Sequence, residues 1–451
     1  MRKLNAPLPP QSDDLDAGLL SLRPRLIWQV FKQERFGFVF LSLYLLFLYL
    51  KPWTAHPWLA YLHLERVSIV VVIFGFFLNQ EYKIERSALN WLMVLFLVQC
   101  IASAALAYDA SYAFSRLDII VEYVVIYFLI TGIVNSERRL FLFFLVYLLA
   151  NFKMSEFGFF SWVRRGFSFA KYGLTGAGWY RNSGELGMEM AMFFDFVLCF
   201  AIVFRNGLSK WTKRFVYFVA TTAMACVLAS SSRGAVVALA ASLLFLVLLR
   251  DKKVKAVAGV TILSLIGYLF IPDRFIARFR TAGHDITSDA RLDYWAKARI
   301  LMHHHPFFGI GYYNWIPYYA HHFHDAIHGR VEMAHNTFLQ LGAEQGYVGL
   351  ALFIIMTVLS FIMNSQSARI AKQQGFDFLY SLALGLNVAG ISMVVGSIFL
   401  TAYWLPSFWI QFAFTVCLRN IVRGKIAATV VAARNPRESS RLAPTYPRSA
   451  S

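Results

Sequence analysis

The feature that most constrains this chain is a succession of long apolar runs separated by short polar gaps. A run of roughly 17 to 25 apolar residues is long enough to cross a bilayer as a helix. We interpret the following runs as membrane spans: Phe36–Leu50, Val67–Leu78, Leu89–Ala107, Leu117–Val134, Leu140–Phe152, Leu186–Phe204, Phe215–Ser230, Ala235–Leu249, Ala256–Ile271, Tyr347–Met363, Tyr380–Phe399 and Trp404–Ile421. The pattern therefore predicts an all-α polytopic membrane protein with about 12 transmembrane helices.

Composition agrees with a chain that lies mostly in lipid. Hydrophobic residues make up 58% of it and charged residues only 15%, whereas a soluble domain carries about 25% charged residues. All of the cysteines fall inside apolar runs: Cys100, Cys199, Cys226 and Cys417. They have neither the spacing of a zinc site nor that of a disulfide framework, so we interpret them as small buried hydrophobic residues.

Lysine and arginine in the short loops predict the orientation, because cytoplasmic loops are enriched in both. With an inside N-terminus, the cytoplasmic segments hold these basic clusters: Arg23–Arg35, Lys83–Arg86, Arg138–Arg139, Arg205–Arg214, Arg250–Lys255, Arg369–Lys372 and Arg423–Arg448. Both termini are therefore expected on the cytoplasmic side. Topology and anionic lipid account for the net charge of +18, so nucleic acid is not an expected partner.

This topology predicts five segments. Residues 1–35 form a cytoplasmic segment, and residues 36–271 form a transmembrane bundle with an outer loop over residues 153–185. Residues 272–346 form a long outer loop, and residues 347–421 complete the bundle. Residues 422–451, rich in Pro, Arg and Ser, are expected to be a disordered basic cytoplasmic tail.

Three segments put cations on the outer side, against the general trend, and ionisable groups near membrane depth are candidates for function. In the first, Lys153–Glu185, the basic residues include Lys171 and Arg181, and glycines such as Gly173 allow close approach of the backbone to a ligand. These cations are suited to a lipid-linked phosphate. The alternative is a flexible loop whose cations meet lipid headgroups.

The second segment is Ser230–Gly234, which leaves almost no loop between two apolar runs. It predicts a tight outward turn between two closely packed helices, with Gly234 permitting the turn. Arg233 then places a permanent cation at the outer membrane edge. The alternative is an arginine that only extends to the lipid headgroups.

The third segment, Pro272 to Ala334, contains most of the histidines together with interleaved aromatic residues. Aromatic rings suit sugar faces and equally suit the membrane interface. A possible zinc constellation is offered by residues with helical spacing, His321, His324, Asp325 and His328, together with the His303–His305 run. No catalytic zinc motif accompanies them, so an amphipathic helix lying on the bundle is the preferred interpretation, and no functional metal is expected.

Three stretches together resemble the O-antigen ligase and polymerase superfamily of bacterial envelope membrane proteins. They are Ser230–Gly234 with the apolar run after it, Ser288–Trp315 (SDARLDYWAKARILMHHHPFFGIGYYNW) and Ala334–Leu350 (AHNTFLQLGAEQGYVGL). The resemblance implies an inverting, metal-independent glycosyl transfer, without a cofactor, on the periplasmic face of the cytoplasmic (inner) membrane. It implies a glycan donor on undecaprenyl diphosphate, an acceptor hydroxyl on lipid A-core or another glycan, and a fold resembling the glycosyltransferase type C architecture.

The resemblance also implies roles for individual residues. Arg233 matches the family's arginine at the membrane edge, which is expected to bind the donor diphosphate, and Arg291 matches the arginine before the aromatic pair of the loop. His335 matches the histidine that opens the family's His-Asn motif. Arg233 and His335 are therefore the expected catalytic residues, because an arginine fork binds phosphate oxygens and an imidazole can accept the proton of a hydroxyl.

The family further has a basic residue before an asparagine that begins a helix. In GWYRNSGELGMEM this corresponds to Arg181, with Lys171 as the alternative, although the more common Pro-Asn pair is absent. Asn336 and Glu344 are expected to support the site without touching substrate, since Glu344 is nine residues after His335 and would face away from it on a regular helix.

Two other classes of function remain open. A transporter or flippase of lipid-linked glycans would contain inverted repeats and discontinuous helices near the midplane of the membrane. A non-catalytic scaffold for envelope assembly would tolerate the loss of Arg233 and His335. Within the family, ligase and polymerase share the quoted motifs, so the sequence leaves that choice open too.

Overall fold

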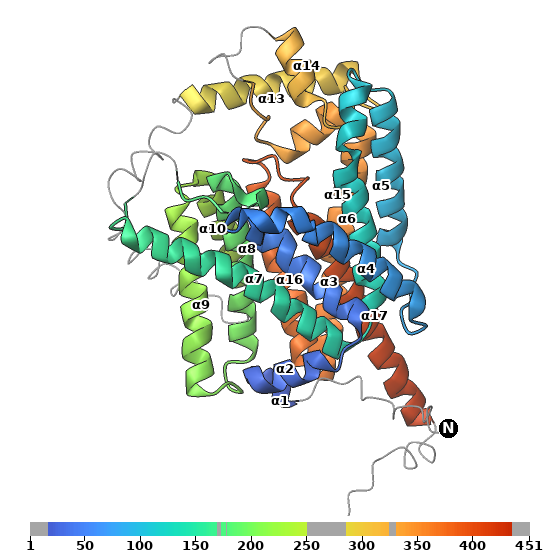
Figure 1. The fold of residues 1–451 in the computed structure, drawn as a ribbon, viewed down its shortest axis with the longest axis vertical. Helices are drawn as coiled ribbons and strands as arrows, with labels where there is room; N and C mark the ends of the chain where they lie inside the picture. The colour runs from blue at the N-terminus through green and yellow to red at the C-terminus, as the bar shows by residue number, and fades with distance from the viewer. Residues whose placement is uncertain (1–16, 169–172, 177, 250–285, 324–330, 435–451) are drawn as a thin grey trace, which may run out of the picture.

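The computed structural model describes residues 17–168, 173–176, 178–249, 286–323 and 331–434, and every regular element in these ranges is helical (Figure 1). The first helices are α1 (Ala17–Leu20), α2 (Pro24–Lys32), α3 (Phe36–Leu50), η1 (Pro52–Thr54), η2 (Pro57–Leu62), α4 (Leu64–Leu78), α5 (Ala88–Ala105), α6 (Ala110–Ile133) and α7 (Glu137–Arg164). The later ones are η3 (Gly178–Tyr180), α8 (Ser183–Val203), α9 (Lys210–Ala229), α10 (Arg233–Leu248), α13 (Ile286–His304), α14 (Trp315–His322), α15 (Thr337–Gln374), α16 (Asp377–Gly396) and α17 (Pro406–Arg434). The predicted all-helical class is confirmed.

Helix length and hydropathy confirm a polytopic membrane protein. Within the described ranges, 7 helices are long and apolar enough to cross a membrane: Pro57–Leu78, Ala88–Ala105, Glu137–Arg164, Ser183–Val203, Lys210–Ala229, Thr337–Gln374 and Asp377–Gly396. Helices α3 and α10 are apolar but shorter. The expected span Ala256–Ile271 lies outside the described residues, so a total of about 12 spans stays a prediction.

Several helix ends differ from the expected boundaries, and α15, for example, covers Thr337–Gln374 where a span over Tyr347–Met363 was expected. Helix α7 continues to Arg164, so residues 153–164, expected in an outer loop, are helical. They pack on α9, where a Cβ added at Gly158 would lie 2.4 Å from the Cys226 Sγ. Helix α17 likewise continues to Arg434, where a disordered tail was expected from residue 422, because Lys425 pairs with Glu137 of α7.

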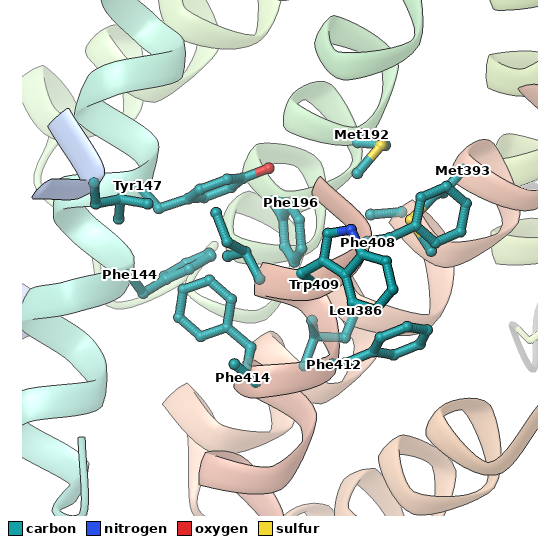
Figure 2. Packing of buried hydrophobic residues seen from close by; sticks show 14 of the residues in the cluster. Phe144, Tyr147, Met192, Phe196, Leu386, Met393, Phe408, Trp409, Phe412 and Phe414 are labelled. Atoms are coloured by element: carbon teal, nitrogen blue, oxygen red, sulfur yellow. The ribbon is translucent and has the colours of Figure 1, made fainter. Parts of the chain in front are cut away.

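The core of the bundle is an aromatic cluster between α7, α8, α16 and α17. Figure 2 shows its members: Phe144, Tyr147, Met192, Phe196, Leu386, Met393, Phe408, Trp409, Phe412 and Phe414. The rings meet edge to face, as Phe144 and Phe414 do with centroids 6.0 Å apart, which is a favourable geometry for aromatic pairs. Helix α16 also packs against α10 and α15. It therefore connects the helices that precede α13 in the chain with the long helix that follows α14.

Short polar side chains begin several of the helices. The residues that accept a hydrogen bond from the first turn of the following helix are Asp109, Ser136, Asn182, Ser209, Ser232 and Asn336. Such a cap contributes about 1 kcal/mol to a helix. The starts of α6 to α10 and of α15 are therefore specified locally by the sequence.

The helices of residues 286–322 and the described helices nearest the two chain ends lie at opposite ends of the molecule (Figure 1). Helices α13 and α14 cover one end of the bundle, whereas α1, α2 and the last turns of α17 lie at the other.

Helix α15 is broken at Gly346, whose φ of 68° and ψ of −175° are not helical. The segment before α14 packs into this break, and a Cβ at Gly346 would lie 2.5 Å from the carbonyl oxygen of Pro306. The backbone N–H of Tyr347 donates to the same oxygen over 2.7 Å, and that of Ile310 donates to the carbonyl of Ala343 over 2.9 Å. The long loop is thus joined to the bundle through backbone groups that the break in the helix exposes.

Candidate functional site

The turn that carries Arg233 is as tight as the sequence predicts. Helix α9 ends at Ala229 and α10 begins at Arg233, whose partly buried side chain follows the Ser232 cap directly. The expected role of Gly234 is wrong, since the left-handed residue of the turn is Ser231, with a φ of 53°. Gly234 instead lets α10 approach its neighbour, because a Cβ there would lie 2.7 Å from the Cβ of Phe399.

His335 lies directly before α15, where the long loop returns to the bundle. Its φ of 49° is left-handed, and the next residue, Asn336, accepts hydrogen bonds of 3.1 Å from the N–H groups of Phe338 and Leu339. The imidazole is 18% exposed, and its Nε2 lies 3.5 Å from a carboxylate oxygen of Glu332. The imidazole ring is therefore held near the start of α15 and remains partly accessible to solvent.

The segment between α16 and α17, residues 397–405, binds the start of α15. The N–H of Thr337 donates to the carbonyl of Ser397 over 2.8 Å, and its hydroxyl donates to that of Leu400 over 2.7 Å. The same hydroxyl accepts the N–H of Ala402 over 2.8 Å. The hydroxyl of Ser397 is buried with no hydrogen-bond partner within the described ranges, so it is available to a bound water or ligand.

The same segment also contacts the starts of α8 and α10. A Cβ at Gly184 would lie 2.6 Å from Leu400, and Gly234 of α10 approaches Phe399 as described above. The helix starts that carry Arg181, Arg233 and His335 therefore meet around residues 397–400. Because the N-terminus of a helix is its positive end, this arrangement with its arginines suits a phosphate-bearing ligand.

Arg181 stands directly before a helix-starting asparagine. The side chain of Asn182 accepts the N–H of Gly184 over 2.8 Å, and the carboxylate of Glu185 accepts the N–H of Asn182 over 3.2 Å. The arginine itself is exposed, whereas Lys171, the alternative, lies outside the described residues. Gly173 approaches the carbonyl of Ser230, with a Cβ distance of 1.8 Å, so the close approach it permits is to the turn before Arg233.

Arg291 belongs to α13, the helix that crosses the outer end of the bundle (Figure 1). One turn later on the same side of α13, the indole N–H of Trp295 donates to the carbonyl of Ala334 over 3.0 Å. Helix α13 therefore lies over the residue that precedes His335. The amphipathic helix expected over His321–His328 is described only as far as His322, the last residue of α14, because residues 324–330 lie outside the described ranges.

Glu344 is a buried acceptor that connects three segments. Its side chain accepts the backbone N–H of Trp315 over 3.0 Å, the amide N–H of Gln340 over 3.3 Å and the hydroxyl of Tyr403. Gln340 in turn accepts the N–H of Ala334 over 3.0 Å, directly before His335. Glu344 is only 1% exposed, so it holds α14, α15 and the segment after α16 together without facing solvent.

Sequence reasoning missed Gln340, Thr337 and Tyr403 as members of this network. A signal was available, since polar side chains in an otherwise apolar stretch usually pair with a partner. The partners themselves could not be named from the sequence, because Thr401 donates to Gln340 across 61 residues over 2.8 Å.

Other polar groups of the outer segment have a structural role. The ammonium of Lys297 lies 2.7 Å from the Asp293 carboxylate and donates to the hydroxyl of Tyr319 over 2.9 Å, so it joins α13 to α14. Burial and the hydrogen bond to Asp293 raise the pKa of Tyr319. His324 and His328 lie outside the described residues, and within the described ranges no three His, Cys, Asp or Glu side chains could hold a metal ion together.

Comparison with known families identifies a domain in the middle of the chain. Residues 190–354 match the family model described as O-antigen ligase, a range that contains Arg233, Arg291, His335 and Glu344 and begins after Arg181. No curated protein sequence matches the chain.

Proposed function

The chain carries an O-antigen ligase family domain over residues 190–354, and on this premise we propose that it is a membrane glycosyltransferase. The proposed donor is a glycan on undecaprenyl diphosphate, and the acceptor is a sugar hydroxyl, on lipid A-core or on a second lipid-linked glycan. The reaction takes place on the periplasmic face of the inner membrane, with both termini in the cytoplasm. The proposed fold is a bundle of about 12 spans that resembles the glycosyltransferase type C architecture.

The observation that carries this proposal is the meeting of three helix starts around residues 397–400. Arg233 begins α10, Arg181 precedes the cap of α8, and His335 precedes the cap of α15. A diphosphate leaving group needs fixed positive charge, and a base must lie near the acceptor. Arginines for the diphosphate and an imidazole for the acceptor are associated with these helix starts.

In the proposed reaction His335 accepts the proton of the acceptor hydroxyl. The acceptor oxygen attacks the anomeric carbon, the bond from that carbon to the phosphate oxygen breaks, and undecaprenyl diphosphate leaves with the electron pair. Attack opposite the leaving group inverts the anomeric centre. Arg233, with Arg291 and Arg181 or Lys171, stabilises the charge that develops on the diphosphate, which makes a metal ion unnecessary.

Asn336 and Glu344 act as positioning residues in this scheme. Asn336 sets the start of α15 directly after His335, and Glu344 keeps α14 and Tyr403 in place around it. Neither residue is proposed to touch the reacting atoms.

Complementation of a deletion strain tests the proposal. Wild type, Arg233→Ala, Arg233→Lys and His335→Ala are compared for envelope glycan and for the pool of lipid-linked donor, with Arg369→Ala, an exposed cation of α15, as the control. We expect Arg233→Ala and His335→Ala to insert normally, lose polymer and accumulate diphosphate-linked donor, while Arg369→Ala behaves as wild type. Arg233→Lys retains only part of the activity, because an ammonium cannot bind phosphate bidentately.

The pool that accumulates also separates the remaining alternatives. Single repeat units indicate a polymerase, and long lipid-linked chains indicate a ligase. Donor retained on the cytoplasmic face would indicate a flippase. Normal glycan in both the Arg233→Ala and His335→Ala strains would contradict the proposed site and favour a scaffold.

A further inference from the structure

An apolar groove of about 520 Å³ lies at the end of the bundle opposite α13 and α14. Its walls come from α2, α3, α7 and α9, with α8 beneath, and include Phe31, Leu46 and Phe152. The volume falls within the range of small-ligand sites, roughly 300 to 1,000 Å³. Helix α2 lies at the opposite end of the molecule from α13 in Figure 1, and Trp295 of α13 contacts Ala334 next to His335, so this groove is separate from the proposed glycosyl-transfer site.

The lining of the groove is suited to a hydrocarbon chain. Apart from the indole N–H of Trp28, its one polar side chain is that of Ser42, whose hydroxyl donates to the Phe38 carbonyl of its own helix over 2.9 Å. Trp28, Leu149 and Phe215 are 57%, 57% and 52% exposed, so the groove opens on the outside of the bundle. An occupant would enter from the membrane and, among the described residues, meet walls that are almost entirely hydrocarbon.

The basic residues closest in sequence to the lining of the groove lie on α2 and at the start of α9, two of the elements that form its walls. Helix α2 and the first residues of α9 carry five cations and no acidic residue: Arg25, Lys32, Lys210, Lys213 and Arg214. Two of these cations lie over exposed tryptophan rings, Lys32 at 5.1 Å from the Trp28 centroid and Arg214 at 4.8 Å from that of Trp211. Tryptophan and basic side chains together are typical of the headgroup level of a membrane, where the cations attract anionic lipids.

We propose that this groove binds one acyl chain of an anionic phospholipid, whose phosphate headgroup is held by the basic residues of α2 and of the start of α9. The chain lies between α2 and α7 and replaces the packing that these helices lack there. The bound lipid therefore fixes the amphipathic α2 against the bundle. The lipid is a resident of the leaflet at the α2 end and is distinct from the polyprenyl donor.

Native mass spectrometry of the full-length protein in detergent tests this site. Phosphatidylglycerol and phosphatidylcholine with identical acyl chains are titrated in parallel. We expect one phosphatidylglycerol to bind to each chain, about tenfold more tightly than phosphatidylcholine, because each basic residue near an anionic headgroup contributes measurably to binding. Raising the salt concentration should reduce the difference.

Two pairs of variants separate the groove from general lipid adhesion. Leu149→Trp fills the groove and should abolish the tight binding, while Ile355→Trp, at a half-exposed apolar residue of α15 away from the groove, should not. Lys32→Gln and Lys213→Gln should each weaken phosphatidylglycerol binding about fivefold, while Arg369→Gln, an exposed cation on α15, should leave it unchanged.

Three results would overturn the proposal. One is equal binding of the two lipids by wild type, and another is tight binding that persists in Leu149→Trp. The third is an equal loss of phosphatidylglycerol binding in Lys32→Gln and Arg369→Gln. That result would mean that the net charge of the protein attracts the lipid and that no specific site binds it. Since the lysine variants leave the packing intact, they decide the question even if Leu149→Trp fails to fold.

Discussion

The carboxylate of Glu344 accepts a hydrogen bond of 3.0 Å from the backbone N–H of Trp315, which ties the first residue of α14 to the broken first part of α15. The same carboxylate accepts the hydroxyl of Tyr403, from the segment that contacts α10. One buried side chain thereby joins the long outer segment to the elements around Arg233 and His335. This relationship leads to the first of four predictions.

Glu344→Ala should destabilise the protein by several kcal/mol, because each buried donor left without its acceptor costs about 1 to 3 kcal/mol. Glu344→Gln should cost less, since the amide oxygen can still accept the Trp315 N–H while the amide nitrogen donates to Tyr403. Thermal unfolding of the detergent-solubilised proteins measures the order of stability of wild type, Glu344→Gln and Glu344→Ala. An alanine variant as stable as wild type would show that the hydrogen bonds of Glu344 do not stabilise the protein.

Gly346→Ala should be more destabilising than Gly375→Ala. Gly375 has left-handed helical angles, φ 72° and ψ 23°, which cost an alanine about 1 to 2 kcal/mol, whereas Gly346, with φ 68° and ψ −175°, is in a region that essentially only glycine adopts. Only at Gly346 would the new Cβ also meet the Pro306 carbonyl, at 2.5 Å, whereas nothing lies within 4 Å at Gly375. The difference in unfolding temperature reports the backbone strain and the contact with the docked loop at Gly346 together, and equal shifts would contradict the importance of this break.

Thr337→Val should lower both stability and glycan yield, because it removes the hydroxyl that bonds to the Leu400 carbonyl and the Ala402 N–H. Two buried backbone groups then lack a partner, at about 1 to 3 kcal/mol each. Thr337→Ser restores the hydroxyl and should recover most of the yield. The matched control is Thr357→Val, since the Thr357 hydroxyl bonds only within its own helix, to Phe353, and that variant should resemble wild type.

Trp295→Phe should reduce glycan yield several-fold while preserving insertion. It deletes the hydrogen bond of 3.0 Å to the Ala334 carbonyl, a bond that contributes about 1 kcal/mol, and so loosens α13 over His335. Trp211→Phe, at a residue that is 76% exposed, provides the control for loss of an indole. Equal glycan yields from the two variants would show that the contact of α13 with Ala334 does not support the site.

Much of the architecture could be predicted because hydropathy and capping are local properties. The run Phe36–Leu50 is reproduced as α3 with the same bounds, and the tight turn before Arg233 occurs where Ser230–Ser232 predict it. The asparagine before α8 and the one before α15 both begin helices. The end of α7 was predicted too early, because its last turns are stabilised by packing on Cys226 of α9 as well as by hydropathy.

By itself, the sequence determined the helical class, the membrane environment, the approximate positions of the apolar helices and the resemblance to the O-antigen ligase family, because periodicity, caps and motifs can be recognised in short windows. Only the tertiary structure decided that residues 397–400 bring the starts of α8, α10 and α15 together, and that Gly346 breaks α15 so that the loop can dock. These contacts join segments as far apart as Gly184 and Leu400. No local pattern encodes such a pairing, because it depends on how the helices pack around one another in the folded bundle.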